Sequence, residues 1–277
     1  MHTPMAKRMI ILFSLFLWTG GYLHSERILA HHVESFEKLQ IDSISFSLSQ
    51  NEREDLLSQL PTDADLNDPS LVLVNESHPW NHDRVVDLVE IQPGFLADRH
   101  AKQAFADLWQ AGKRAGHYLT VVSAHRTKEQ QAANRQQRIK WYQSLGYSLP
   151  QSIDLTNSYY AQPESTEHLT GLALDLIGDD WLRNRNDLSQ DYSSYESAKW
   201  LAENAHNFGF ILRYPEGKKR ETGYQFEPWH YRYVGRSNAA FIHKYQLTLE
   251  EYIDLLQERK MQIEQIDHQP IPAKDSD

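Results

Sequence analysis

The stretch FGFILRYPEGKKRETGYQFEPWHYRYVG, residues 208–235, holds two short apolar runs separated by a turn-rich segment. The runs 210–213 and 229–234 are rich in aromatic and branched side chains, and Pro215-Glu-Gly217 between them is a turn signal. Both runs are therefore predicted to be strands. Glu227 and His230 stand three positions apart where the second run begins. A carboxylate and an imidazole this close together, among aromatic residues, indicate a functional site at the start of the predicted strand.

Outward from this stretch, short strands and amphipathic helices interleave along the chain. Residues 100–115 carry apolar side chains at the spacing of about 3.6 residues that is typical of a helix with one buried face. The remaining segments are predicted as strands at 71–74, 85–89, 118–122 and 173–177, helices at 51–60, 127–142, 195–208 and 238–266, a polar loop at 147–163 and a charged insertion at 181–192. The predicted fold class is α+β, with a small antiparallel sheet and flanking helices around a cleft.

The first 30 residues have the composition of a targeting segment. Lys7 and Arg8 precede the apolar run 9–18, which is the pattern of a secretory signal. The run is shorter than the ~20 residues that span a bilayer comfortably, so residues 1–30 are predicted to be a signal peptide or a signal anchor. Export to the cell envelope is expected, with the protein either anchored in the membrane by its N-terminus or released.

The rest of the chain divides into three parts by composition. Residues 31–69 are polar and acidic and are predicted to be a spacer. Residues 70–266 are predicted to form the folded catalytic domain, and residues 267–277 a disordered tail.

Composition excludes several classes of function. The net charge is −10, whereas a nucleic-acid-binding surface is basic, so no nucleic-acid partner is expected. The chain has no cysteine, which rules out thiolate zinc ligands, disulfides and a thiol nucleophile. Contact with a membrane is expected only through the N-terminal segment, and no pattern indicates the oligomeric state.

A second stretch, Glu167-His-Leu-Thr-Gly-Leu-Ala-Leu-Asp175, supplies another histidine and an aspartate. His168 and Asp175 would lie on opposite faces of a continuous strand, because side chains alternate along a strand. Gly171 permits a turn between them, which would leave His168 on the incoming loop and Asp175 on the strand. A buried carboxylate in such a leucine-rich strand needs a cation or several hydrogen-bond donors.

Two histidines, one aspartate and an unattached glutamate are the parts of a catalytic zinc site. Such a site has three protein ligands, an open position for water and a base that takes a proton from that water. We therefore predict that His168, Asp175 and His230 bind one Zn²⁺ per chain and that Glu227 is the base. The alternative is that these residues only pack or lie on the surface, since the chain has 14 histidines and spacing alone gives false positives.

These residues, in this order, resemble the zinc D-alanyl-D-alanine carboxypeptidases of the VanY type. The resemblance covers residues 71–253 and rests on the blocks 165–175, 209–218 and 227–235 and on Ser123-Ala-His-Arg126. It implies that His168, Asp175 and His230 bind zinc and that Glu227 is the catalytic base. It also implies that Arg126 holds the peptide oxygen or the terminal carboxylate of the substrate, a role that suits its forked guanidinium.

Three further residues are predicted to contact the substrate. Gln131 belongs to the blocks that carry the resemblance, Thr166 stands where the family usually has serine, and Trp229 lies between the predicted base and a predicted zinc ligand. Ala124-His125 also replaces the Gly-Tyr pair that usually precedes the arginine. These departures touch no metal ligand, but they flank the peptide-binding cleft and leave the substrate preference open.

The reaction that the resemblance implies is removal of the C-terminal D-Ala from a peptidoglycan stem peptide. Two enzymatic alternatives stay open, an L,D-carboxypeptidase that acts on tetrapeptide stems and a D-Ala-D-Ala dipeptidase. A non-catalytic cell-wall-binding module with a structural zinc is the alternative from a different class. The unliganded carboxylate of Glu227 argues against that module, because a structural zinc site has no use for it.

Overall fold

Four strands form the central antiparallel sheet of the computed structural model, in the order β3-β4-β6-β5. They are β3 (Leu119–Ser123), β4 (Ala173–Gly178), β6 (His230–Tyr233) and β5 (Phe210–Leu212). The structure describes residues 49–80, 85–185 and 187–267, which belong to one compact unit. The predicted α+β class is confirmed, and these four strands lie close to their predicted positions.

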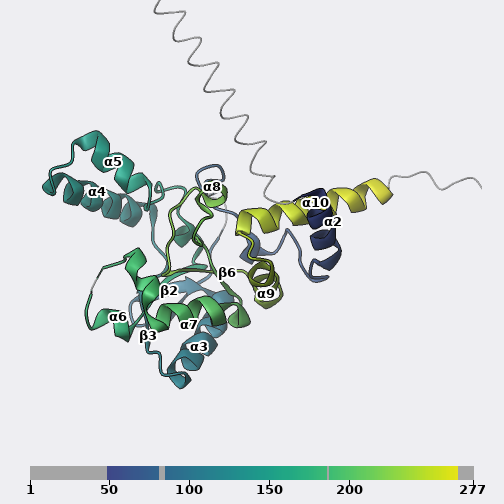
Figure 1. Cartoon of the computed structure of the whole chain (residues 1–277), viewed down its shortest axis with the longest axis horizontal. Coiled ribbons are helices and arrows are strands. Elements are labelled where there is room, and N and C mark those ends of the chain that lie inside the picture. The colour runs from purple at the N-terminus through teal and green to yellow at the C-terminus, as the bar shows by residue number, and fades with distance from the viewer. Residues whose placement is uncertain (1–48, 81–84, 186, 268–277) are drawn as a thin grey trace, which may run out of the picture. The chain divides into compact units, whose positions relative to one another are not determined.

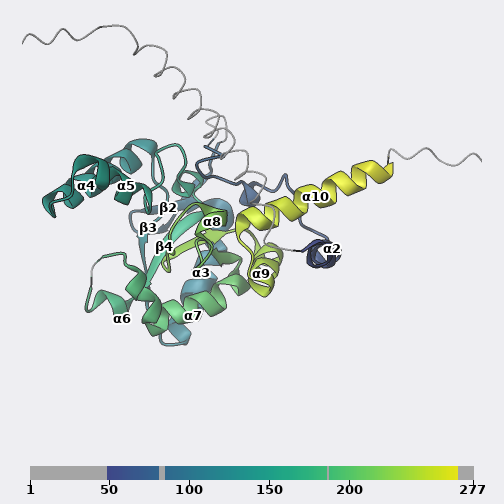
Figure 2. The ribbon, with the colours of Figure 1, turned by 45° about the horizontal axis from the view of Figure 1, so that its top comes forward.

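Helices α3 (Arg99–Arg114) and α7 (Glu196–Asn204) pack against one face of this sheet (Figure 2). Leu174 and Leu176 of β4 point to that face and join the side chains of both helices in one apolar core. Asp175 lies between these leucines, so it points to the opposite face of the sheet, where it lines a cleft.

The predicted polar loop at 147–163 was wrong, because it contains the helix α5 (Leu149–Asn157). Figures 1 and 2 show α5 beside α4 (Lys128–Ser144). The buried side chains of α5 are the small polar Ser152 and Thr156, whose hydroxyls donate to carbonyls one turn back. A helix that buries hydroxyls in place of aliphatic groups has no apolar period to detect.

The helix predicted at 238–266 is in fact two helices, α9 (Arg236–Tyr245) and α10 (Leu249–Asp267). Gln246 between them has a φ of 52°, in the left-handed region that ends α9. Thr248 and Glu251 then form the capping box of α10. The amide of Thr248 donates to Glu251 Oε2 at 2.7 Å, and the amide of Glu251 donates to Thr248 Oγ1 at 3.2 Å.

Helix α2 (Gln50–Gln59) lies beside α10 in both views of the ribbon (Figures 1 and 2). Leu56 and Leu60 pack with Leu256 of α10 in a second apolar core. Residues 49–69 were expected in the polar spacer, but they belong to the folded unit. The few leucines of this segment are buried together. The sequence analysis missed this because the segment is polar on average.

The strand predicted at 71–74 does not form. The short helix η1 (Pro69–Leu71) ends there, and the carbonyls of Ser70 and Val72 accept hydrogen bonds from the guanidinium of Arg232 at 2.9 and 2.7 Å. Carbonyls that a neighbouring strand would have used are therefore bonded to a buried side chain.

The other elements are short. Strand β1 (Leu88–Gln92) was predicted at 85–89 and pairs with β2 (Phe95–Asp98). The remaining short helices are η2 (Glu167–Thr170), α6 (Asp179–Leu182), η3 (Gln190–Ser194), η4 (Ala205–Phe208) and α8 (Lys219–Thr222).

The predicted signal segment 1–30 and the tail after Asp267 lie outside the described residues. Within the part of the chain that is described, no helix is long and apolar enough to cross a membrane.

Candidate active site

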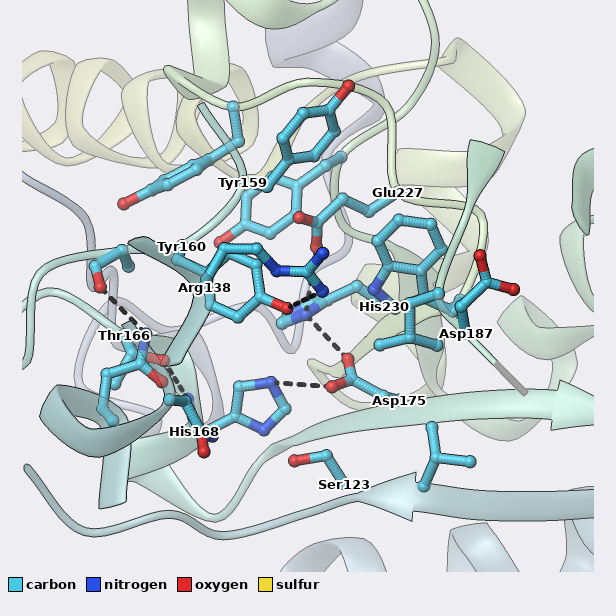
Figure 3. Close-up of a pocket in the computed structure, with 18 of the residues that line it drawn as sticks. Ser123, Arg138, Tyr159, Tyr160, Thr166, His168, Asp175, Asp187, Glu227 and His230 are labelled. Carbon is cyan, nitrogen blue, oxygen red and sulfur yellow. Dashed lines mark hydrogen bonds and ion pairs between the residues drawn. The ribbon is translucent and has the colours of Figure 1, made fainter. Parts of the chain in front are cut away.

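Three of the predicted site residues converge on the cleft face of the sheet (Figure 3). Asp175 of β4 pairs with His230 of β6 in the strand register, and Asp175 Oδ1 lies 3.2 Å from His230 Nδ1. His168 of η2 brings its Nε2 to 3.4 Å from Asp175 Oδ2. All three side chains are buried, and one nitrogen or oxygen of each lies within 4.8 Å of those of the others.

Gly171 makes this convergence sterically possible. It ends η2 with a φ of 70°, so the chain turns between His168 and the start of β4. A Cβ added at Gly171 would lie only 2.7 Å from the amide nitrogen of Asp98. Both the left-handed conformation and the close backbone approach exclude a larger residue, and the turn that Gly171 was expected to permit is confirmed.

The two histidines present different ring nitrogens to the cluster. His168 Nδ1 lies 2.7 Å from the carbonyl of Ala124, so it carries the proton and leaves Nε2 as a free acceptor. His230 Nε2 lies 3.4 Å from Glu167 Oε2, which leaves Nδ1 to face the cluster. Among the described residues, His168 Nε2 and Asp175 Oδ1 are buried without a hydrogen-bond partner. Together with His230 Nδ1, which lies 3.2 Å from Asp175 Oδ1, they form a set of two imidazole nitrogens and a carboxylate that fits a Zn²⁺ ion.

The pKa values of the three side chains favour binding of a cation by the cluster. Burial lowers the pKa of His168 to about 4, so its ring is neutral. Burial acts to raise the pKa of Asp175, but His168 and His230 outweigh it and hold that pKa well below its usual range. Burial likewise opposes the charge on His230, yet the carboxylates of Asp175 and Glu167 raise its pKa to about 9. A metal at Nδ1 would replace that proton.

Glu167, which the sequence analysis did not select, supports His230 from behind. Its carboxylate is buried, and its Oε1 accepts from Arg213 Nε at 2.7 Å and from Arg232 Nη1 at 2.6 Å. Both arginines are fully buried. A carboxylate that holds the far nitrogen of a ligand histidine fixes the orientation and tautomer of the ring. The only sequence signal was its position next to His168.

Glu227 lies just before β6, as expected, and faces the cluster without belonging to it. Its amide donates to the carbonyl of Tyr214 at 3.0 Å, and its Oε2 lies 3.7 Å from His230 Nδ1. The side chain is buried, and burial raises the pKa of its carboxyl to about 8, with His230 acting in the opposite direction. A group that gains and loses a proton near neutral pH is suited to proton transfer.

Arg126 and Gln131 are linked at the edge of the cluster. Arg126 lies between β3 and α4, and its amide donates to the carbonyl of His168 at 3.2 Å. Its Nη2 lies 3.5 Å from Asp175 Oδ2, and its Nη1 donates to Gln131 Oε1 at 2.9 Å. Gln131 is itself fixed, because its Nε2 donates to the carbonyl of Ala161 at 2.8 Å. Gln131 therefore positions the guanidinium.

Thr166 and Trp229 both line the cleft, and both also have structural roles. Thr166 Oγ1 accepts from the amide of His168 and so caps η2. Trp229 is buried in a small apolar core with Trp181 and Tyr192. The cleft has a volume of about 900 Å³ and continues past these residues along α4, where it is lined by Arg138 and Trp141. The sequence analysis predicted a helix here but did not select Arg138 or Trp141.

Comparison with known proteins identifies relatives of this chain. Residues 95–236 match the model of the VanY family, described as D-alanyl-D-alanine carboxypeptidase. A D-alanyl-D-alanine carboxypeptidase of Enterococcus faecalis is 34% identical over 207 residues, which cover 75% of this chain and 74% of that protein.

Solved structures resemble the chain as well. A D,D-pentapeptidase VanY from a VanB-type resistance cassette, solved in complex with Zn(II), has a TM-score of 0.60 at 34% identity and covers 67% of this chain and 99% of its own. VanYB in complex with D-alanine-D-alanine has the same TM-score at 35% identity, over 67% and 97% of the two chains. The LD-carboxypeptidase LdcB has a TM-score of 0.57 at 30% identity, over 68% and 88%.

Proposed function

Because this chain belongs to the VanY family of D-alanyl-D-alanine carboxypeptidases, we propose that it removes the C-terminal D-Ala from peptidoglycan stem peptides. The observation that carries the proposal is the buried cluster of His168, Asp175 and His230, faced by the free carboxylate of Glu227. The relative of known structure that binds Zn(II) supports zinc as the cofactor. The relative in complex with D-alanine-D-alanine supports the substrate class.

The roles of the residues follow from their positions. His168 Nε2, His230 Nδ1 and one oxygen of Asp175 would hold the zinc. When bound, zinc supplies polarisation of the scissile carbonyl and a lower pKa for the attacking water. Glu227 takes a proton from the water on its carboxylate and passes it to the leaving amine. Its burial beside the cluster raises the pKa of the carboxyl and so favours the step in which Glu227 holds the proton that goes to the amine.

Arg126 is proposed to bind the substrate. Its guanidinium is held between Asp175 and Gln131 with Nε buried and without a partner among the described residues. A peptide oxygen or a terminal carboxylate would satisfy that donor and be fixed in one orientation. Gln131 keeps the arginine in place, and Thr166 and Trp229 shape the cleft around it.

The test is product analysis with the zinc-loaded full-length protein. We expect one D-Ala to be released from a stem pentapeptide, detected by mass spectrometry, with little release from the tetrapeptide. Release from the tetrapeptide alone would instead make the protein an L,D-carboxypeptidase, the activity named for LdcB. Hydrolysis of free D-Ala-D-Ala alone would make it a dipeptidase. If protein with one zinc per chain releases D-Ala from none of these, the protein is a wall-binding module.

We also propose that residues 1–30 direct the domain across the cytoplasmic membrane. The support is the sequence Lys7-Arg8 before the apolar run 9–18, because positive charge is retained on the cytoplasmic side. Fusion of residues 1–40 to a reporter that is active only outside the cytoplasm tests this, and the control replaces Lys7 and Arg8 by glutamate. A reporter that stays wholly in the cytosol would overturn the proposal.

A further inference from the structure

One face of α4 forms a wall of the cleft. Gln131, Asn134, Arg138 and Trp141 all line the cleft, and their spacing of three or four residues places them on the same side of the helix. Gln131 bonds to Arg126, so the first turn of this face lies at the metal end of the cleft. Arg138 follows seven residues later, which corresponds to about 10 Å along the helix axis.

The guanidinium of Arg138 is held by aromatic side chains. Its central carbon lies 4.8 Å from the ring centroid of Trp141 and 5.2 Å from that of Tyr160, and its Nη2 donates to the Tyr160 hydroxyl at 2.8 Å (Figure 3). Tyr160 is fixed in turn, because its carbonyl accepts from the buried guanidinium of Arg135. Arg138 is therefore oriented before any ligand arrives.

Arg138 also differs from other arginines of the described chain in its lack of an acidic partner. The buried arginines Arg213 and Arg232 each bond to the carboxylate of Glu167. Arg185, near the opposite rim, pairs with Asp191 at 2.7 Å. In the described part of the chain, by contrast, no carboxylate lies within ion-pair distance of Arg138. A preorganised and unpaired guanidinium in a substrate cleft is suited to bind an anionic group of the substrate.

We propose that Arg138, with Tyr160 and Trp141, binds a carboxylate of the stem peptide about three residues before the scissile bond. An extended peptide spans about 3.5 Å per residue, so the 10 Å between the level of Gln131 and that of Arg138 corresponds to about three residues. In a stem pentapeptide this residue is the γ-linked D-glutamate, which carries either a free α-carboxylate or, after amidation, a carboxamide. The inference rests on the proposed function and specifies its substrate as the unamidated stem.

The experiment compares the two forms of the stem pentapeptide with the zinc-loaded full-length protein. The parent protein should cleave the peptide with D-glutamate at a KM about tenfold lower than the peptide with D-isoglutamine, because a guanidinium bonds a carboxylate more strongly than an amide. In Arg138→Gln the KM for the acidic peptide should rise to that of the amidated peptide, at an unchanged kcat. Tyr160→Phe, which removes one hydrogen bond and keeps the ring, should give an intermediate KM. Lys140→Gln removes a charge from the exposed side of the same helix and should keep the parental ratio.

Several outcomes would overturn the inference. One is a parent protein with equal KM values for the two peptides, and another is an Arg138→Gln variant that loses affinity equally for both. If Arg138→Gln does not fold, as judged by its melting temperature, an unchanged ratio in Tyr160→Phe rejects the subsite. If the parent cleaves neither peptide, the proposed function fails on its own. Equilibrium binding then decides the subsite, since tighter binding of the acidic peptide that Arg138→Gln abolishes would support it and equal binding would reject it.

Discussion

Two buried glutamates flank His230, and their surroundings shift the pKa values of their carboxyls in opposite directions. Glu167 is 1% exposed and Glu227 is 5% exposed, so both carboxyls are removed from water. Burial acts to raise the pKa of Glu167, but Arg213 and Arg232 outweigh it and hold that pKa well below the usual range. Burial raises the pKa of Glu227 to about 8, because no described arginine bonds to it. Partners, and not burial alone, decide whether a buried carboxyl stays ionised.

This difference between the two glutamates corresponds to the two sides of the cluster formed by His168, Asp175 and His230. Behind His230, the charged groups bond to one another and form a rigid support that links Glu167 through Arg213 to Glu250 of α10. On the cleft side, Glu227 and the Nε of Arg126 remain available to a ligand. Variants behind the histidine should therefore change stability and metal affinity, whereas variants in front should change turnover or substrate affinity.

The largest effect is expected for Glu227→Gln. This change keeps the size of the side chain and removes the proposed base, so D-Ala release should fall by about 10²- to 10⁴-fold. Zinc content by elemental analysis and the melting temperature should stay normal, because the three ligands remain. Asp175→Ala is the contrasting variant and should lose zinc along with activity. If Glu227→Gln releases D-Ala at a near-normal rate from a peptide that the parent cleaves, Glu227 is not the base.

Arg232→Met tests the support behind the histidine. The substitution leaves Glu167 buried with one arginine fewer, and breaking a buried ion pair on one side costs about 3 kcal/mol or more of the free energy of unfolding. Urea denaturation of the zinc-free protein measures it. Arg236→Met is the matched control, because Arg236 pairs with Asp107 on the surface with 63% of its side chain exposed. If the two variants lose equal amounts of unfolding free energy, the buried ion pairs contribute no more to stability than a surface pair.

Glu167→Gln is the direct counterpart of Glu227→Gln and should have a smaller effect of a different kind. Removing the charge behind His230 should weaken zinc binding by about 10- to 100-fold, as is typical for partners of metal-binding histidines. Competition with a chelator measures this affinity for both glutamine variants. If Glu167→Gln and Glu227→Gln bind zinc equally well, the proposed division between the two sides is wrong.

The smallest effect is expected for Gln131→Ala on the cleft side. The change removes one hydrogen bond to Arg126, and a net loss of about 1 kcal/mol corresponds to a KM about fivefold higher. The zinc affinity should be unchanged. Arg126→Ala should cost more activity than Gln131→Ala, again with normal zinc content and folding. Loss of zinc from either variant would make this pair structural.

Much of the site could be predicted because its signals are local. Glu227-Pro-Trp-His230 and the His168–Asp175 spacing lie within single turns and strands. Gly171 reports a turn through its own backbone, and the alternation of Leu174, Asp175 and Leu176 assigns faces of β4 without any knowledge of its neighbours. The capping boxes that begin α4 and α10 are local in the same way.

What escaped prediction depends on groups that are distant in the sequence. Glu167 acquires its role from Arg213 and Arg232, which follow it by 46 and 65 positions. Helix α5 lies against α4 and buries Ser152 and Thr156, and residues 49–69 fold because α10 covers their leucines.

The sequence by itself therefore determined the ligand types, the predicted base, the helices with an apolar stripe and the strands that carry the site. Only the tertiary structure decided which carboxylate lies behind His230 and which in front, and left Arg138 of the cleft without an acidic partner among the described residues. The reason is physical. Residue types and spacings fix local conformation, whereas the charge state of a buried group depends on whatever side chains the fold places within a few ångströms of it.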